Sequence, residues 1–237
     1  MPLTHGPADR PGLCLFDLDD TLLPMDSDHT WGQFMIDIGW VDADEYRRRN
    51  DAFYAQYRAG TLDIDEYIGF ATRAWRVRPQ AEAEAARERF MRELIEPQMR
   101  PAARELVRRH QEAGDLVAIV TATNEFVTTP IAAAFGVEHL LAVRLARDDG
   151  GTITGRVLGV PSFREGKVTR VHEWLATLGR QLSDFGRISV YSDSPNDLPL
   201  LEMANHPVAT NPSPALESVA RERGWRVLHL FHDQETH

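Results

Sequence analysis

The sequence predicts an α/β protein with a doubly wound parallel sheet and one inserted, all-helical domain. Three observations support this prediction. Short apolar runs alternate with helical segments, a pattern typical of parallel sheets covered by helices. Residues 24–100 carry helical periodicity and no convincing strand. Polar residues follow the apolar runs, at the sheet edge where ligands bind in such folds.

Apolar runs define the expected strands. Residues 12–17, 116–120 and 188–191 are short enough for buried strands, and two weaker runs, at 208–209 and 226–230, flank the last helix. Residues 140–145 and 152–158 are separated by Asp148-Asp149-Gly150-Gly151, which predicts a hairpin.

Start signals place the helices of the same part of the chain. A polar helix is expected over 102–112, and a helical segment follows the second strand, with Pro130 leaving its start open. Ser162 with Glu165 forms a capping-box pattern that predicts a helix over 163–178. Ser194-Pro195 and Ser213-Pro214 each place an N-cap residue before proline, which opens two further helices.

Four helices are expected in the insert. Apolar residues repeat at helical spacing in two clear stretches: Trp31, Phe34, Met35 and Ile38, then Ile64, Tyr67, Ile68, Ala71 and Trp75. Weaker patterns lie around Phe53 and Tyr57 and around Ala83 and Phe90. We therefore predict a core formed by residues 1–23 and 101–237 and a helical domain formed by residues 24–100.

Composition limits the possible partners. The net charge is −10 and no long basic run is present, which argues against nucleic acid as a partner. The single cysteine, Cys14, lies in the first strand, so no disulfide framework is expected. Residues 1–12 are polar, and no apolar run approaches the ~20 residues that span a bilayer. We expect a cytoplasmic protein with no membrane partner.

Polar residues cluster where the predicted strands end. Asp17, Asp19 and Asp20 follow the first strand directly, and like charges this close repel each other unless a cation offsets them. The cluster therefore implies a divalent metal ion. Further strand-end or helix-start residues are expected at the same edge of the sheet: Thr121, Lys167, Asp193 and Asp197.

These motifs resemble those of the haloacid dehalogenase superfamily of phosphohydrolases. The family pattern is DxDxT, then a strand-end Thr or Ser, a Lys and a DxxxD-type acidic motif, and all four occur here in order between residue 12 and about residue 230. The insert resembles the helical cap of the phosphoserine phosphatase-like branch, and the tail from Asn211 to Trp225 is similar to that branch. One departure is that Ser192 and Ser194 flank Asp193, where the family often has glycine.

The residue types suit phosphate transfer. Asp17 is placed to attack phosphorus and form an aspartyl phosphate, and Asp19 to protonate the leaving alkoxide and later to activate water. The carboxylates of Asp17 and Asp193, with the backbone carbonyl of Asp19, would bind Mg²⁺.

Other residues at this edge would hold the phosphoryl group. Lys167 would offset the charge of the nucleophile and of the phosphoryl group. The phosphate-binding residues are expected to be the Thr121 hydroxyl, nearby backbone N–H groups and the loop around them, which includes Leu18, Thr21 and Ala122. Thr21 would also orient the first motif, and Asp197 would orient Lys167 or a metal-bound water.

The resemblance implies a small phosphorylated metabolite as substrate. In phosphoserine phosphatases an acidic residue nine positions after the nucleophile receives the substrate's amino group, and Asp26 has that spacing here. Alternatively, Asp26, Ser27 and Asp28 only begin a helix. No convincing counterpart of the cap arginine that binds the substrate carboxylate is present, because Arg73 is out of register. Phosphoserine, histidinol phosphate and other amino-alcohol phosphates all remain candidates.

Three other functions are compatible with parts of this pattern. A phosphotransferase or mutase of the same superfamily would use the same nucleophile with a different cap. Metal-free dehalogenation would not need the Asp19 acid. A non-catalytic protein that binds a phosphorylated metabolite would be expected to lack a catalytic residue, and none is missing. The sequence sets no oligomeric state.

Overall fold

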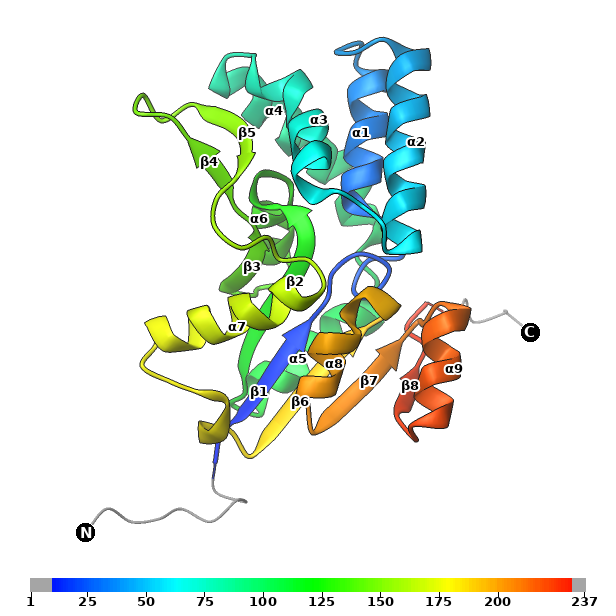
Figure 1. Ribbon diagram of the computed structural model, residues 1–237, viewed down its shortest axis with the longest axis vertical. Coiled ribbons are helices and arrows are strands. Elements are labelled where there is room, and N and C mark those ends of the chain that lie inside the picture. Colours follow the sequence, from blue (N-terminus) through cyan, green and yellow to red (C-terminus); the bar gives the residue numbers. More distant parts are fainter. Residues whose placement is uncertain (1–9, 232–237) are drawn as a thin grey trace.

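The computed structural model describes residues 10–231 and contains a six-stranded parallel sheet (Figure 1). The strand order is β3-β2-β1-β6-β7-β8, and every neighbouring pair is parallel. The strands are β1 (Gly12–Phe16), β2 (Leu116–Asn124), β3 (His139–Val143), β6 (Arg187–Ser192), β7 (His206–Thr210) and β8 (Arg226–Leu228). The predicted doubly wound fold is therefore confirmed.

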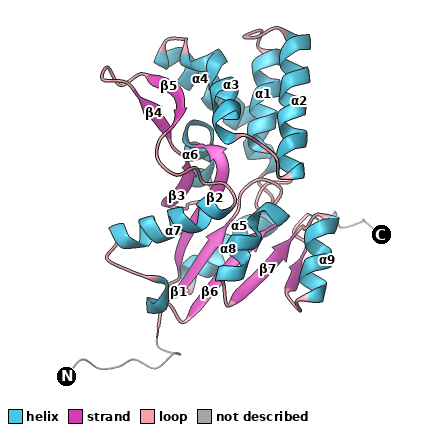
Figure 2. Ribbon diagram, in the orientation of Figure 1, coloured by secondary structure: helices cyan, strands magenta, loops and turns pink. Residues whose placement is uncertain are grey.

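Helices cover both faces of the sheet (Figure 2). One face packs against α7 (Glu165–Thr177), α8 (Leu198–Met203) and α9 (Pro214–Glu222), and the other against α5 (Pro101–Glu112) and α6 (Glu125–Ala134). Alternate residues of β1 serve the two faces, as the pleat of a strand requires. Leu13 and Leu15 pack on the face covered by α7, α8 and α9, whereas Cys14 and Phe16 pack on the face covered by α5 and α6.

The region between β1 and α5 contains the four expected helices, which lie beyond the carboxyl ends of the strands (Figure 1). They are α1 (Ser27–Asp37), α2 (Ala43–Ala59), α3 (Ile64–Arg76) and α4 (Gln80–Phe90). Aromatic contacts join this helical region to the core: the Trp75 ring stacks on Phe126 of α6 with centroids 4.0 Å apart. The boundaries of a separate cap domain at residues 24 and 100 remain a prediction.

The predicted hairpin is correct in part. Only β4 (Leu145–Arg147) pairs with β5 (Ile153–Val157), whereas residues 139–143 form β3 of the main sheet. The prediction of a single strand over 140–145 was therefore wrong, because this segment contains parts of two strands that belong to different sheets. The hairpin packs against α3, where the Arg76 guanidinium donates a hydrogen bond to the Thr154 carbonyl at 2.8 Å. A β-hairpin thus flanks the helical region.

The capping box predicted at Ser162 was wrong. Helix α7 begins at Glu165, and the Ser162 hydroxyl instead donates to the Leu141 carbonyl of β3 at 2.8 Å. The chain turns tightly here, because a Cβ at Gly166 would lie 2.1 Å from the Pro161 carbonyl oxygen. Only glycine fits at this position, and the turn places Lys167 in the first turn of α7.

Helix α6 continues through Pro130 instead of beginning after it. Asn124 is its N-cap residue and accepts a hydrogen bond from the Val127 amide. A proline inside a helix leaves the carbonyl four residues earlier without its usual donor. That carbonyl belongs to Phe126, and the Arg87 guanidinium of α4 donates to it at 3.1 Å. The helical region therefore compensates for a break in a core helix.

Two core side chains donate to the carboxyl end of α2. Asn196 Nδ2 lies 2.8 Å from the Tyr57 carbonyl oxygen, and Arg164 Nη1 lies 2.9 Å from the Gly60 carbonyl oxygen. Carbonyl groups in the last turn of a helix have no partner within the helix. These two bonds, which we call the α2 latch, hold the helical region against the core.

Within residues 10–231, no helix is long and apolar enough to span a membrane. Residues 1–9 and 232–237 of the predicted core, including most of the polar segment predicted over 1–12, lie outside the described residues.

Candidate active site

A buried lysine joins two of the predicted acidic residues. Lys167 Nζ lies 2.7 Å from Asp17 Oδ1 and 2.7 Å from Asp197 Oδ2, and only 1% of the Lys167 surface is exposed. Asp17 follows β1 directly, and its amide donates to the Tyr191 carbonyl of the neighbouring strand at 2.9 Å. Three predicted motifs that are distant in the sequence therefore meet at the carboxyl edge of the sheet.

Asp197 positions this lysine and does not complete a capping box. Ser194 provides the N-cap by accepting from the Asn196 amide, while the Asp197 carboxylate binds Lys167. The same Asp197 oxygen also accepts from the Ser192 hydroxyl at 2.7 Å. Ser192 occupies a position where the family often has glycine, and here its hydroxyl fixes the acidic residue.

Thr21 connects the first and last acidic motifs. Its Oγ1 lies 3.1 Å from Asp193 Oδ1 and 3.4 Å from Asp17 Oδ2, and it accepts a hydrogen bond from the Asp193 amide at 3.0 Å. The loop after β7 supports both motifs, because Asn211 Nδ2 donates to the Thr21 carbonyl and the Asp193 carbonyl accepts from the Ser213 amide. This geometry supports the orienting role predicted for Thr21.

The Asp19 carboxylate is held by donors from α1 and from β2. Its Oδ1 accepts from the Ser27 amide at 2.7 Å, and its Oδ2 accepts from the Thr123 hydroxyl at 2.9 Å. Burial raises the pKa of Asp19, while these donors act in the opposite direction. A raised pKa suits a carboxyl group that must carry a proton to a leaving group near neutral pH.

The other residues predicted to bind phosphate are Thr121, Ala122 and Leu18. Thr121 is buried near the carboxyl end of β2, and its hydroxyl accepts from the Thr123 amide at 3.1 Å. Ala122 lines the pocket beside Asp19. Leu18 is fully buried, and its carbonyl accepts from the amides of Leu22 and Leu23, which shapes the loop after Asp17.

Electrostatics at this edge favour a bound cation. Burial raises the pKa of Asp17 to about 7 despite the neighbouring Lys167 ammonium, and burial and then Asp17 raise that of Asp193 well above its ordinary value. The pKa of Lys167 is raised, since Asp17 and Asp197 together outweigh the effect of its burial. Of the three carboxylates named here, only Asp17 and Asp197 contact the Lys167 ammonium group.

The donor set fits Mg²⁺. Within residues 10–231, no three His, Cys, Asp or Glu side chains could hold a metal ion together. Asp17 and Asp193 nevertheless converge on the Thr21 hydroxyl and offer hard oxygen donors. Mg²⁺ is commonly held by one or two carboxylates, with water and substrate oxygens completing its shell. The Asp19 side chain is bound by the Ser27 amide and the Thr123 hydroxyl, so a contribution of its backbone carbonyl to a metal site remains a prediction.

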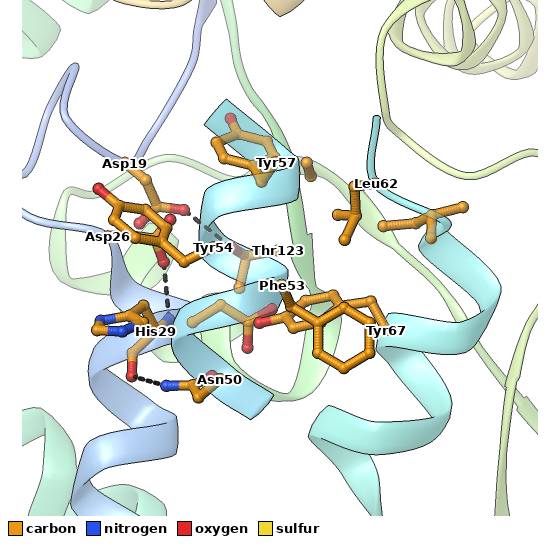
Figure 3. A pocket seen from close by; sticks show the side chains of 13 residues that line it. Asp19, Asp26, His29, Asn50, Phe53, Tyr54, Tyr57, Leu62, Tyr67 and Thr123 are labelled. Carbon is orange, nitrogen blue, oxygen red and sulfur yellow. Dashed lines mark hydrogen bonds between the residues drawn. The ribbon is translucent and has the colours of Figure 1, made fainter. Parts of the chain in front are cut away.

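A small pocket opens beside Asp19, between β2 and helices α1, α2 and α3 (Figure 3). Its volume is about 30 Å³, enough for about one water molecule. Aromatic side chains from the helical region, including Phe53, Tyr54, Tyr57 and Tyr67, face Asp19 and Thr123 across it. Of the described residues that line the pocket, none is a lysine or an arginine.

Two acidic residues at the start of α1 also line this pocket. Asp26 is the N-cap residue, since its Oδ1 accepts from the His29 amide at 2.7 Å, so the two readings of Asp26 are compatible. Asp28 is only 5% exposed, and burial followed by the charge of Asp19 raises its pKa to about 7. Both residues flank Ser27, whose amide binds Asp19.

Three residues of this site were not singled out from the sequence: Thr123, Asn124 and Asp28. Thr123 and Asn124 complete the polar run that begins at Thr121, and a polar run at the end of a buried strand was the signal that could have identified them. Asp28 gave no such signal, because an acidic residue in a first helical turn is usual on a solvent-exposed helix.

Comparisons with known proteins agree with this geometry. A family model described as haloacid dehalogenase-like hydrolase matches residues 14–202. A histidinol-phosphatase of Neisseria meningitidis serogroup C (strain 8013) is 43% identical over 218 residues, covering 92% of this chain and 98% of that protein. A solved structure of a Bordetella pertussis protein of unknown function is 49% identical, with a TM-score of 0.88, and covers 94% of this chain and 100% of its own.

More distant structures share the fold. A substrate-bound phosphoserine phosphatase has a TM-score of 0.66 at 18% identity, with 93% of each chain covered. At this level of identity the likeness concerns the fold alone.

We expect Asp28→Asn to gain stability relative to the wild type as the pH rises from 4 to 8. The pKa of Asp28 is about 7 in the folded protein against an ordinary value of 3.8, so the folded state binds more protons across this interval and loses stability as the pH rises. Each pKa unit corresponds to about 1.4 kcal/mol, which limits the effect to about 4 kcal/mol. Asparagine does not titrate and removes this loss.

Urea unfolding at several pH values measures the difference between the two proteins. The relevant quantity is how the stability difference between Asp28→Asn and the wild type changes with pH, because the buried asparagine side chain also changes the absolute stability. The exposed Asp44→Asn variant serves as a control and should follow the wild type. A constant difference for Asp28→Asn between pH 4 and pH 8 would contradict the prediction.

Proposed function

Because this chain belongs to the haloacid dehalogenase-like hydrolase family and is a phosphatase, we propose that it hydrolyses L-histidinol phosphate or a closely similar amino-alcohol phosphate. The reaction would depend on Mg²⁺ and pass through an aspartyl phosphate on Asp17. The observation that carries the proposed substrate is the pocket beside Asp19, which contains three carboxylates and, among its described lining residues, no lysine or arginine.

The charge of this pocket favours an aminated substrate without a carboxylate. An ammonium group near Asp26 and Asp28 would be stabilised, whereas the carboxylate of phosphoserine would be repelled by the same residues. Aromatic side chains form the rest of the wall and suit a flat ring. The 43% identical histidinol-phosphatase supports this assignment over phosphoserine.

The first step would transfer the phosphoryl group to Asp17. Its carboxylate oxygen forms a bond to phosphorus while the bond from phosphorus to the substrate oxygen breaks, and the Asp19 carboxyl group gives its proton to the departing alkoxide. Lys167 stabilises the charge that develops on the nucleophile and the phosphoryl oxygens, and the Thr121 hydroxyl binds one of those oxygens.

The second step would release phosphate. The Asp19 carboxylate, now deprotonated, takes a proton from water, whose oxygen attacks phosphorus and displaces the Asp17 carboxylate. The Ser27 amide and the Thr123 hydroxyl hold Asp19 in place for both proton transfers.

The carboxylates of Asp17 and Asp193 and the Asp19 carbonyl would hold Mg²⁺. When bound, the ion would reduce the repulsion between the nucleophile and the phosphate and polarise the phosphoryl group. A small phosphorylated metabolite in the cytoplasm would be the partner, and the net charge of −10 argues against nucleic acid in that role.

A panel of phosphomonoesters tests the proposed substrate. We expect kcat/KM for L-histidinol phosphate to exceed that for L-phosphoserine at least about tenfold, because only the latter brings a carboxylate beside Asp26 and Asp28. p-Nitrophenyl phosphate has neither an amino group nor a carboxylate, so its hydrolysis measures the phosphatase reaction alone. Faster hydrolysis of phosphoserine, or no hydrolysis of histidinol phosphate by protein that turns over p-nitrophenyl phosphate, would refute the assignment.

Asp17→Asn should reduce turnover of p-nitrophenyl phosphate at least about 10³-fold, because a neutral amide cannot form the aspartyl phosphate. Circular dichroism would verify that the variant is folded. Asp44→Asn, the same change on the exposed surface of α2, should retain full activity. Comparable turnover by Asp17→Asn would exclude Asp17 as the nucleophile.

Removal of divalent metal by EDTA should abolish activity, and added Mg²⁺ should restore it, because Asp17 and Asp193 otherwise repel the phosphate. Beryllium fluoride added with Mg²⁺ should inhibit by occupying Asp17 as a phosphoryl mimic. Undiminished activity in EDTA would contradict the metal site, and insensitivity to beryllium fluoride would count against the covalent intermediate.

A further inference from the structure

Asp28 carries a buried oxygen atom that has no partner. Its Oδ1 accepts from Asn124 Nδ2 at 3.3 Å, but its Oδ2 has no hydrogen-bond partner among the described residues. The Tyr67 phenol lies near enough to lower the pKa of Asp28, although its geometry falls short of a hydrogen bond. Buried carboxylate oxygens in native proteins are nearly always paired, so this one requires an explanation.

A purely structural role does not provide one. The N-cap of α1 is already Asp26, which binds the His29 amide. An acidic residue in the first turn interacts favourably with the helix dipole, but an exposed side chain obtains this as well. Burying a carboxylate without full pairing is unfavourable. The position of Asp28 therefore suits a partner that is absent from the polypeptide.

The surroundings define the chemistry of that partner. Asp28 lines the pocket together with the aromatic rings of Phe53 and Tyr67, which are in edge contact with centroids 5.3 Å apart. Aromatic walls favour a flat ring, and the unpaired oxygen requires a hydrogen-bond donor. An imidazole ring with an N–H group meets both requirements.

The position of Asp28 relative to the catalytic acid fits a two-part substrate. The Ser27 amide binds Asp19, the proposed acid for the leaving oxygen. Asp26 and Asp28 are the sequence neighbours of Ser27, so both lie close to this acid. Histidinol phosphate carries an ammonium group and an imidazole on the same short chain. Two separate carboxylates can therefore receive two separate nitrogen groups.

We propose that Asp28 accepts a hydrogen bond from the ring N–H of the substrate and thereby selects an imidazole over an apolar ring. This inference rests on the proposed function and deepens it, because it assigns the discrimination between amino-alcohol phosphates to one residue. Asp26 would recognise the amine that all these substrates share.

The test compares L-histidinol phosphate with L-phenylalaninol phosphate, which has the same amine and phosphate but no ring N–H. We expect the wild type to prefer histidinol phosphate at least about 10²-fold in kcat/KM, because the apolar ring leaves the buried Asp28 oxygen unpaired. In Asp28→Asn the preference should fall at least tenfold, mainly through a higher KM for histidinol phosphate. Asp28→Leu should bring the preference close to one or invert it.

Controls separate this inference from its premise. Asp44→Asn should keep the wild-type preference, and p-nitrophenyl phosphate turnover reports for each variant whether the catalytic chemistry is intact. An Asp28→Asn preference equal to that of the wild type, or an equal loss on both substrates, would overturn the role of Asp28 while leaving the proposed function standing. Wild-type protein that hydrolyses p-nitrophenyl phosphate but not histidinol phosphate would instead overturn the proposed function.

Inhibition by L-histidinol gives a second measurement. L-Histidinol should compete with p-nitrophenyl phosphate in the wild type and do so at least tenfold more weakly in Asp28→Asn, whereas L-phenylalaninol should not lose affinity. Equal inhibition of both proteins by L-histidinol would also overturn the role of Asp28.

Discussion

The proposed catalytic edge of the sheet depends on one buried ammonium group. Lys167 contacts Asp17 and Asp197 at the same distance, and these three residues come from α7, the end of β1 and the turn before α8. Removing one partner of a buried ion pair costs about 3–5 kcal/mol, because the remaining charge is left uncompensated. The interaction therefore fixes the relative positions of three segments and keeps Asp17, the proposed nucleophile, next to a positive charge.

The local backbone of each segment serves this arrangement. The tight turn at Gly166 starts α7 close to the sheet, which allows a lysine in its first turn to reach the end of β1. The Ser192 hydroxyl holds Asp197, and the Thr21 hydroxyl joins Asp17 to Asp193. Neutral hydroxyl groups can bridge carboxylates without adding charge, so the net negative potential that attracts a metal ion is preserved.

The sequence predicted the sheet, the four helices between β1 and α5, and the edge of the sheet at which Asp17, Lys167 and Asp193 meet. These predictions succeed because they rest on periodicity and on the rule that strand ends in a parallel sheet face one edge. The division between β3 and β4 could not be predicted, since a continuous apolar run does not indicate which strand it pairs with. Ser162 was misassigned because a serine before a glutamate has the same local pattern whether it caps a helix or bonds to a distant strand. The burial of Asp28 depends on how α1 packs against β2 and α3, which no local pattern records.

The α2 latch has a consequence for catalytic turnover. The pocket beside Asp19 has a volume of about 30 Å³, which is smaller than a phosphorylated metabolite, so binding of such a substrate there requires a wider pocket than this structure has. Asn196 and Arg164 donate hydrogen bonds to the last carbonyls of α2, which is one of the helices that line this pocket. A typical hydrogen bond contributes only about 1 kcal/mol net. Two such bonds can therefore open and re-form at low cost, so the α2 latch would not prevent α2 from moving relative to the core.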